Sequence, residues 1–234
     1  MDAFYRQPVE HNMHKPRFIY ITGCDGTGKT TQARLIMERL RAEGVEPVHR
    51  WLRYPFLLSV PLLAYARWRG YSWYEKSGDV RHGYWDFRRS PLLQIFLPWT
   101  LLLDALLTAL IKVYLPLALG RTIVCERFVL DMLVDMSVAF GDSELYRRLP
   151  GRLYPLLLPR RSAIAILDLD AETVRDRRKD LRIDWRLDTK LNTYRRLANT
   201  LQLPLLANSD SISCLFFQVC ELTGIATRSD INYE

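Results

Sequence analysis

The clearest chemical signal in the chain is a glycine-rich segment that ends in a lysine and a threonine, GCDGTGKT from Gly23 to Thr30. It matches the pattern G-x-x-x-x-G-K-[ST] in full, between an apolar run and a stretch with helical periodicity. Glycines let backbone N–H groups curl around phosphate oxygens, and a helix N-terminus adds positive charge. Lys29 would reach the β- and γ-phosphates of ATP, and the Thr30 hydroxyl would face Mg²⁺. The predicted ATP-binding residues are Gly23, Asp25, Gly26, Thr27, Gly28, Lys29, Thr30 and Thr31.

Two charged residues at the end of another apolar run fit the same site. Glu126 and Arg127 end the segment TIVCER, which has the composition of a buried strand. A carboxylate there can hold Mg²⁺ through water, and an arginine can bind a phosphate with two parallel hydrogen bonds. The alternative is a charged pair at a strand mouth. Asp25 lies inside the glycine-rich segment. It has either a functional role beside the bound triphosphate or a structural role in stabilising the turn.

A dense run of arginines and aspartates lies between residues 175 and 188. One interpretation is a solvated helix with ion pairs four residues apart. The other is a mobile lid whose arginines reach the transferring phosphoryl group. The arginines of the run are Arg175, Arg177, Arg178, Arg182 and Arg186.

The stretch from Val48 to Pro55 has no acid and contains Arg50 and Arg53. A kinase that phosphorylates a hydroxyl needs a base, whereas phosphate oxygens already carry negative charge. Arginines suit a dianionic phosphate, so we expect Arg50, Arg53 and Arg127 to bind an acceptor that already carries one. The alternative is a hydroxyl acceptor, since Asp131 and Asp135 could act as a base or bind ribose hydroxyls.

Apolar runs alternate with helical patterns along the chain, and this alternation predicts the strands and helices that position these residues. Strands are expected near residues 17–22, 47–51, 122–126, 163–169 and 203–207, with helices near 29–43, 129–140, 171–178, 188–201 and 211–222. Strands that alternate with helices predict an α/β fold with a parallel sheet covered on both faces. Ligands of such sheets bind beyond the carboxyl ends of the strands.

The segment from Leu92 to Leu119 is mostly apolar and about as long as a membrane span. It contains Pro98, Asp104, Lys112 and Pro116, which favours a helix buried in the core or in a dimer contact. Membrane association is the alternative.

Composition excludes several classes of protein. The 234 residues include 49% hydrophobic and 25% charged residues, which excludes a disordered chain. The net charge of +7 suits a polyanionic ligand. The four cysteines form no C-x-x-C pair and no zinc spacing, so we expect free thiols in the cytoplasm. The N-terminus has no apolar signal-peptide segment.

The segments GCDGTGKTTQ, CERF and ILDLDAE, followed by the arginine-rich run and Tyr194 to Ala198, resemble thymidylate kinases in order and spacing. This family belongs to the nucleoside monophosphate kinases, and the resemblance covers most of residues 17–222. It implies a P-loop sandwich of three layers with strand order 2-3-1-4-5, a homodimer, and an acceptor like dTMP whose sugar Asp25 would contact. Family members without an arginine in the cradle supply one from the lid, so Gly26 favours the lid interpretation, with Arg182 and Arg186 as catalytic lid arginines. The chain lacks the acid and the glycines that the family has after the second strand, and Asp131 stands where the family usually has serine.

The expected function is ATP- and Mg²⁺-dependent phosphoryl transfer to a nucleoside monophosphate, with catalytic residues Lys29, Glu126, Arg127, Arg182 and Arg186. The alternatives are a P-loop kinase of a hydroxyl acceptor and a P-loop ATPase without a nucleotide acceptor. No nucleic-acid partner is expected. We expect one kinase domain at residues 17–226 between tails at 1–16 and 227–234, with an apolar helical acceptor-binding and dimer region at 52–119 and a lid at 175–188.

Overall fold

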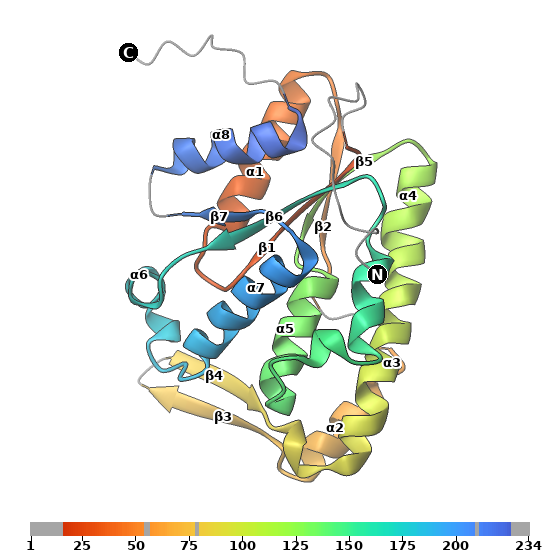
Figure 1. The fold of residues 1–234 in the computed structure, drawn as a ribbon, viewed down its shortest axis with the longest axis vertical. Coiled ribbons are helices and arrows are strands. Elements are labelled where there is room, and N and C mark those ends of the chain that lie inside the picture. Colours follow the sequence, from red (N-terminus) through yellow and green to blue (C-terminus); the bar gives the residue numbers. More distant parts are fainter. Residues whose placement is uncertain (1–15, 54–56, 78–79, 209–210, 226–234) are drawn as a thin grey trace.

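The computed structural model describes residues 16–53, 57–77, 80–208 and 211–225, so the predicted tails lie almost wholly outside it. A five-stranded parallel sheet carries helices on both faces, as the sequence predicts (Figure 1). The central strand, β1, is buried along its whole length, which explains its unbroken apolar sequence. The strands of this sheet are β1 (Phe18–Gly23), β2 (Pro47–Trp51), β5 (Thr122–Glu126), β6 (Ser162–Asp168) and β7 (Leu205–Ala207).

The strands lie in the order β2-β5-β1-β6-β7. These labels differ from the predicted 2-3-1-4-5 because two strands of a separate hairpin, β3 and β4, intervene along the chain. The five strands of this sheet, counted alone in chain order, occupy positions 2-3-1-4-5. Because all neighbours run parallel, the carboxyl ends of β1, β5 and β6 meet at one edge, where the glycine-rich segment follows β1.

Two layers of helices cover the sheet (Figure 1). Helices α1 and α8 pack on one face, where Ala33, Ile36 and Leu40 of α1 contact Ile19 and Ile21 of β1. Helices α3, α5 and α7 pack on the other face in the larger core. The α-helices are α1 (Lys29–Ala42), α2 (Val60–Trp68), α3 (Pro91–Ala109), α4 (Leu115–Ala118), α5 (Val129–Phe140), α6 (Ala171–Arg177), α7 (Leu187–Leu201) and α8 (Ile212–Thr223). Short 3₁₀-helices are η1 (Phe87–Arg89), η3 (Leu145–Arg147), η4 (Gly151–Leu157) and η5 (Lys179–Leu181).

An antiparallel hairpin, β3 (Ser72–Ser77) and β4 (Val80–Trp85), lies within the region that the sequence predicts to be helical, 52–119. Aromatic residues, which favour strands, explain the difference. Trp73 stacks on Tyr84, and Tyr84 stacks on Trp185 within the predicted lid. The hairpin therefore packs against the chain that leads into α7.

The apolar segment forms one long rod: α3, the π-helix η2 (Leu110–Tyr114) and α4. Residues Pro91–Ala118 are apolar and long enough to cross a membrane by length and composition, and 33% of their most apolar window is buried. One side of the rod packs in the core while the other faces outward, so the expectation of a buried helix holds for one side only.

Candidate active site

The glycine-rich segment forms a cradle at the carboxyl end of β1. Gly23 has φ 137°, and a Cβ there would lie 2.3 Å from the Leu167 carbonyl oxygen of β6. Gly28 has φ 92°, and a Cβ there would lie 2.7 Å from Nδ2 of Asn208. Only glycine fits at either position. The Asn208 amide donates to the Thr27 carbonyl at 2.8 Å, so a residue after β7 braces the cradle.

The lysine and the threonine of the cradle occupy different environments. Lys29 is nearly buried, and its Nζ donates to the Cys24 carbonyl at 2.6 Å. Burial, and then the Arg127 guanidinium, lower the pKa of Lys29 to about 8. The Thr30 hydroxyl donates to Oε2 of Glu126 at 2.6 Å. On its other oxygen, Glu126 contacts Nε2 of His49 at 2.8 Å.

A chain of alternating charges runs from the cradle to α5. Asp25 pairs closely with Arg127 and lies 3.5 Å from Nη1 of Arg53. Arg53 in turn pairs with Asp135 at 3.1 Å. Burial tends to raise the pKa of Asp25, but Arg127 and Arg53 outweigh it and hold that pKa at about 2. Asp25 is therefore ionised at neutral pH.

Arg127 has a backbone φ of 59°, a left-handed conformation that is uncommon outside glycine. The buried carboxylate of Asp131 holds this turn. It accepts from the Phe128 N–H at 3.0 Å and from Nη1 of Arg127 at 3.3 Å. It also accepts from the hydroxyls of Tyr20, Thr22 and Tyr194. Because Asp131 is completely buried and has five donors, it does not present an oxygen to an acceptor.

Together these residues line a pocket of about 370 Å³. Five cations and two acids line it, so it suits a polyanion such as a nucleotide phosphate chain. Its lining residues are Asp25, Gly26, Gly28, Lys29, Thr30, Thr31, Trp51, Arg53, Glu126, Arg127, Arg177 and Arg178.

Among the arginines of the predicted lid, the structure brings Arg177 and Arg178 to the pocket and leaves Arg182 and Arg186 outside its lining. Arg182 bonds to the Arg175 carbonyl and to Asp176. Arg186 stacks on Trp185, with 4.5 Å from Cζ to the ring centroid, and donates to the Trp85 carbonyl. The catalytic roles of Arg182 and Arg186 stay predictions; in this structure Trp73 and Tyr84 of the hairpin also lie against Arg186.

The structure also places the predicted acceptor-binding arginines in different environments. Arg53 lines the pocket, but Arg50 does not, and its buried Nε has no hydrogen-bond partner among the described residues. Successive side chains of a strand point to opposite faces, so Arg50 points away from His49 and Trp51. Sequence reasoning gave no role to His49 and missed Asn208. The position of His49 two residues before the end of a strand beside β5 is the only signal that could have found it.

Glu126 and Thr30 place two hard oxygen atoms together, which fits the carboxylate-poor coordination that Mg²⁺ shows beside phosphates. Among the described residues no group of three or more His, Cys, Asp or Glu side chains is placed to hold a metal ion. A divalent cation here would depend on the phosphates of a bound nucleotide for its other ligands.

Comparisons with known proteins were informative only for solved structures. No protein-family model matches the chain, and no curated protein matches it. Among solved structures, the chain is similar to the thymidylate kinase of Ehrlichia chaffeensis, with 15% sequence identity and a TM-score of 0.49. The match covers 89% of this chain and 98% of the Ehrlichia chain.

Proposed function

We propose that the chain transfers the γ-phosphoryl group of ATP to an acceptor that already carries a phosphate, a nucleoside monophosphate such as dTMP. The observation that carries this proposal is the set of carboxylates around the pocket, none of which is suited to take a proton from a hydroxyl. Arg127 and Arg53 hold the pKa of Asp25 at about 2, far below the value of an effective base at neutral pH.

The other nearby acids are engaged by neighbouring side chains. Asp131 is buried and accepts five hydrogen bonds, and Asp135 is paired with Arg53. Glu126 is held between Thr30 and His49. A phosphate acceptor needs no base, because its oxygen is already anionic.

In the proposed reaction an acceptor phosphate oxygen forms a bond to the γ-phosphorus. The bond from that phosphorus to the β,γ-bridging oxygen breaks, and ADP leaves. Lys29 neutralises charge on the donor phosphates, while Arg53 and Arg127 bind the acceptor phosphate. Arg178, which lies beside Gly26, and Arg177, which also lines the pocket, add further positive charge around the phosphates. Thr30 and Glu126 would hold Mg²⁺, which supplies charge neutralisation on the phosphates.

The test is a panel of nucleoside monophosphates and nucleosides, including dTMP and thymidine, with ATP and Mg²⁺ and with ADP release as the readout. Lys29→Ala should lower turnover by about 10²-fold or more, the typical effect of removing one preorganised donor. Arg53→Ala should raise the KM of the monophosphate far more than the KM of ATP. Arg34→Ala, an exposed arginine on α1, is the matched control and should change neither KM.

Turnover of nucleosides in place of monophosphates would establish the hydroxyl-kinase alternative. ADP release that no acceptor accelerates would establish a P-loop ATPase.

A further inference from the structure

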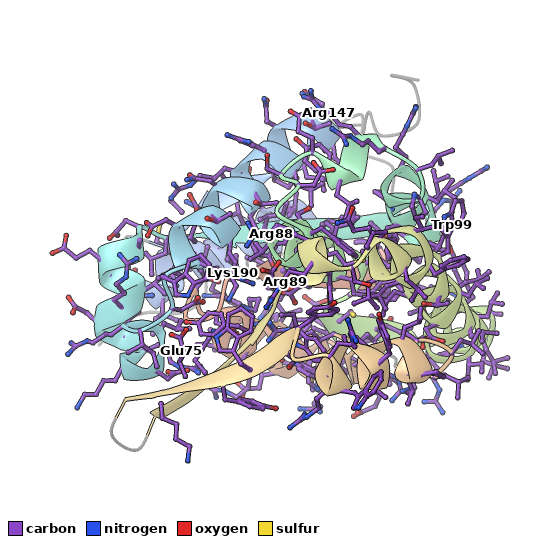
Figure 2. All side chains as sticks on the ribbon, turned by 90° about the horizontal axis from the view of Figure 1, so that it is seen from below. Glu75, Arg88, Arg89, Trp99, Arg147 and Lys190 are labelled. Atoms are coloured by element: carbon purple, nitrogen blue, oxygen red, sulfur yellow. The ribbon has the colours of Figure 1, made fainter. Side chains whose placement is uncertain are left out.

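The outward side of α3 is apolar over its whole length. Its large side chains recur every three, four or seven residues, so they lie along one side of the helix. Their exposed fractions range from 37% for Leu106 to 59% for Ile95. Figure 2 shows Trp99 at the outer edge of the molecule. We call this set the α3 face: Leu92, Ile95, Phe96, Trp99, Leu103, Leu106, Leu107 and Leu110.

The opposite side of the same helix is fixed in the core. Leu93, Leu97, Ala105 and Ala109 are completely buried, and the Tyr154 hydroxyl donates to the Pro98 carbonyl at 2.7 Å. A helix that left this packing to cross a bilayer would expose the sheet. The rod can therefore bind apolar material only along its length, as a helix lying in a membrane surface does.

Basic residues gather at the C-terminal end of the rod. Strand register aligns Phe18 with Ile123 and with Ser162. Arg17, Arg121 and Arg161 lie one or two residues before these positions, so they gather at the amino ends of neighbouring strands. Arg160 adjoins them in the chain, and all four side chains are exposed. None of the four has an ion-pair partner among the residues that the structure describes. We call them the basic edge.

The N-terminal end of the rod is basic as well. The exposed Arg88 and Arg89 precede α3, and Arg88 pairs with Asp86 at 2.8 Å. Over the sequence, residues 57–121 hold eight Lys or Arg and four Asp or Glu, while residues 145–161 hold five arginines and no acid. These two segments carry net charges of +4 and +5, and their sum exceeds the +7 of the whole chain. The remaining residues together are therefore slightly acidic.

We propose that the α3 face docks, lying flat, on an anionic lipid bilayer, with the basic edge against the headgroups. Apolar side chains that include a tryptophan enter the boundary between headgroups and acyl chains, and arginines around them contact anionic lipids. A second copy of the chain fits this surface less well. Both ends of the rod are basic, so parallel and antiparallel pairing each bring like charges together. This inference does not depend on the proposed function.

The experiment is flotation of the full chain with vesicles of phosphatidylcholine alone or mixed with phosphatidylglycerol. The chain should float with the mixed vesicles, and binding should fall as salt is added. Leu103→Asp on the α3 face should lower the partition coefficient by about tenfold or more, since a charged side chain is costly in an apolar medium. Phe217→Asp, at an exposed apolar position on α8, is the matched control and should stay within about twofold.

The role of charge is tested separately from folding. Arg160→Gln with Arg161→Gln should weaken binding to mixed vesicles by about fivefold for each arginine. Ile95→Cys, carrying an environment-sensitive fluorophore in a Cys214→Ser background, should shift to shorter emission wavelength on mixed vesicles. Ile212→Cys on α8 should not shift.

Three results would overturn the proposal. The chain does not float with anionic vesicles; it floats equally well after Leu103→Asp; or light scattering without lipid shows a stable dimer that Leu103→Asp dissociates. The last result would assign the α3 face to a second copy.

Discussion

Asp131 offers the sharpest test of the architecture around the pocket. Replacing it with alanine removes the acceptor of five hydrogen bonds. The buried hydroxyls of Tyr20, Thr22 and Tyr194 then lose the carboxylate to which they donate. It also leaves the nearly buried Arg127 with one carboxylate fewer. Each unsatisfied buried donor costs about 1–3 kcal/mol, although the cavity relaxes and admits water. Breaking a buried ion pair alone costs about 3–5 kcal/mol, so we expect Asp131→Ala to lower the free energy of unfolding by about 3–5 kcal/mol.

Asp131→Asn keeps one oxygen in place and should lose less, about 1–3 kcal/mol, because one buried carboxylate interaction is replaced by a poorer one. Urea denaturation, followed by circular dichroism, measures both values. Asp135→Asn is the control, since that carboxylate makes an ion pair but is 15% exposed; it should lose about 1 kcal/mol.

The kinetic result separates two roles. If Asp131 only positions Arg127, then Asp131→Asn should raise the KM of the phosphate acceptor, and its pH profile should keep the shape of the wild type. A folded Asp131→Ala that loses less than about 1 kcal/mol would refute the assignment of a buried hub. A stable Asp131→Asn with kcat abolished and KM unchanged would mark Asp131 as a base, and the phosphate-acceptor proposal would then fail.

Three further predictions concern the cradle. Gly26→Ala should lower kcat about tenfold, because a Cβ there would lie 3.2 Å from Val174 and 3.3 Å from Arg178 at a φ of 84°, and the lid segment would have to move; steady-state kinetics with ATP measures this. The pKa of Asp25 is lowered from 3.8 to about 2, so its contribution to stability is complete above pH 4 and is lost as the pH falls toward 2; urea titrations should show a shallower acid dependence in Asp25→Asn. Burial raises the pKa of the Cys24 thiol to about 11, so Cys24 should resist iodoacetamide at pH 8, as peptide mass spectrometry would show.

Local patterns in the sequence predicted the sheet well. Buried parallel strands such as 122–126 read as unbroken apolar runs, which makes them easy to recognise. The helix predicted near 129–140 ends at Gly141, which adopts the left-handed conformation. The cradle was predictable because its glycines and Lys29 act within one short segment. Positions set by tertiary contacts were not predictable. The hairpin of Ser72–Trp85 decides where Arg186 goes, and no local spacing reveals that contact.

The same limit applies to the side chains that approach the cradle from other strands. Arg50 and Arg53 are equivalent by composition, and only their place relative to the end of β2 directs Arg53 into the pocket. Asn208 follows a three-residue strand at the edge of the sheet, too short to show a pattern. Its role becomes visible only when Thr27 and Gly28 are seen beside it.

The number of hydrogen bonds that each buried carboxylate accepts distinguishes the structural acids of this molecule from an acid that can still bind a ligand. Asp104 accepts from three backbone N–H groups and the Ser59 hydroxyl, and it thereby fixes the start of α2 against α3. Asp131 accepts five hydrogen bonds and fixes the turn at Arg127. Among the described residues, Glu126 accepts only from Thr30 and His49 at the pocket wall, so its oxygens retain capacity for a cation or its water. Asp104 and Asp131 therefore hold the backbone around them in place, and Glu126 keeps oxygens available at the pocket wall.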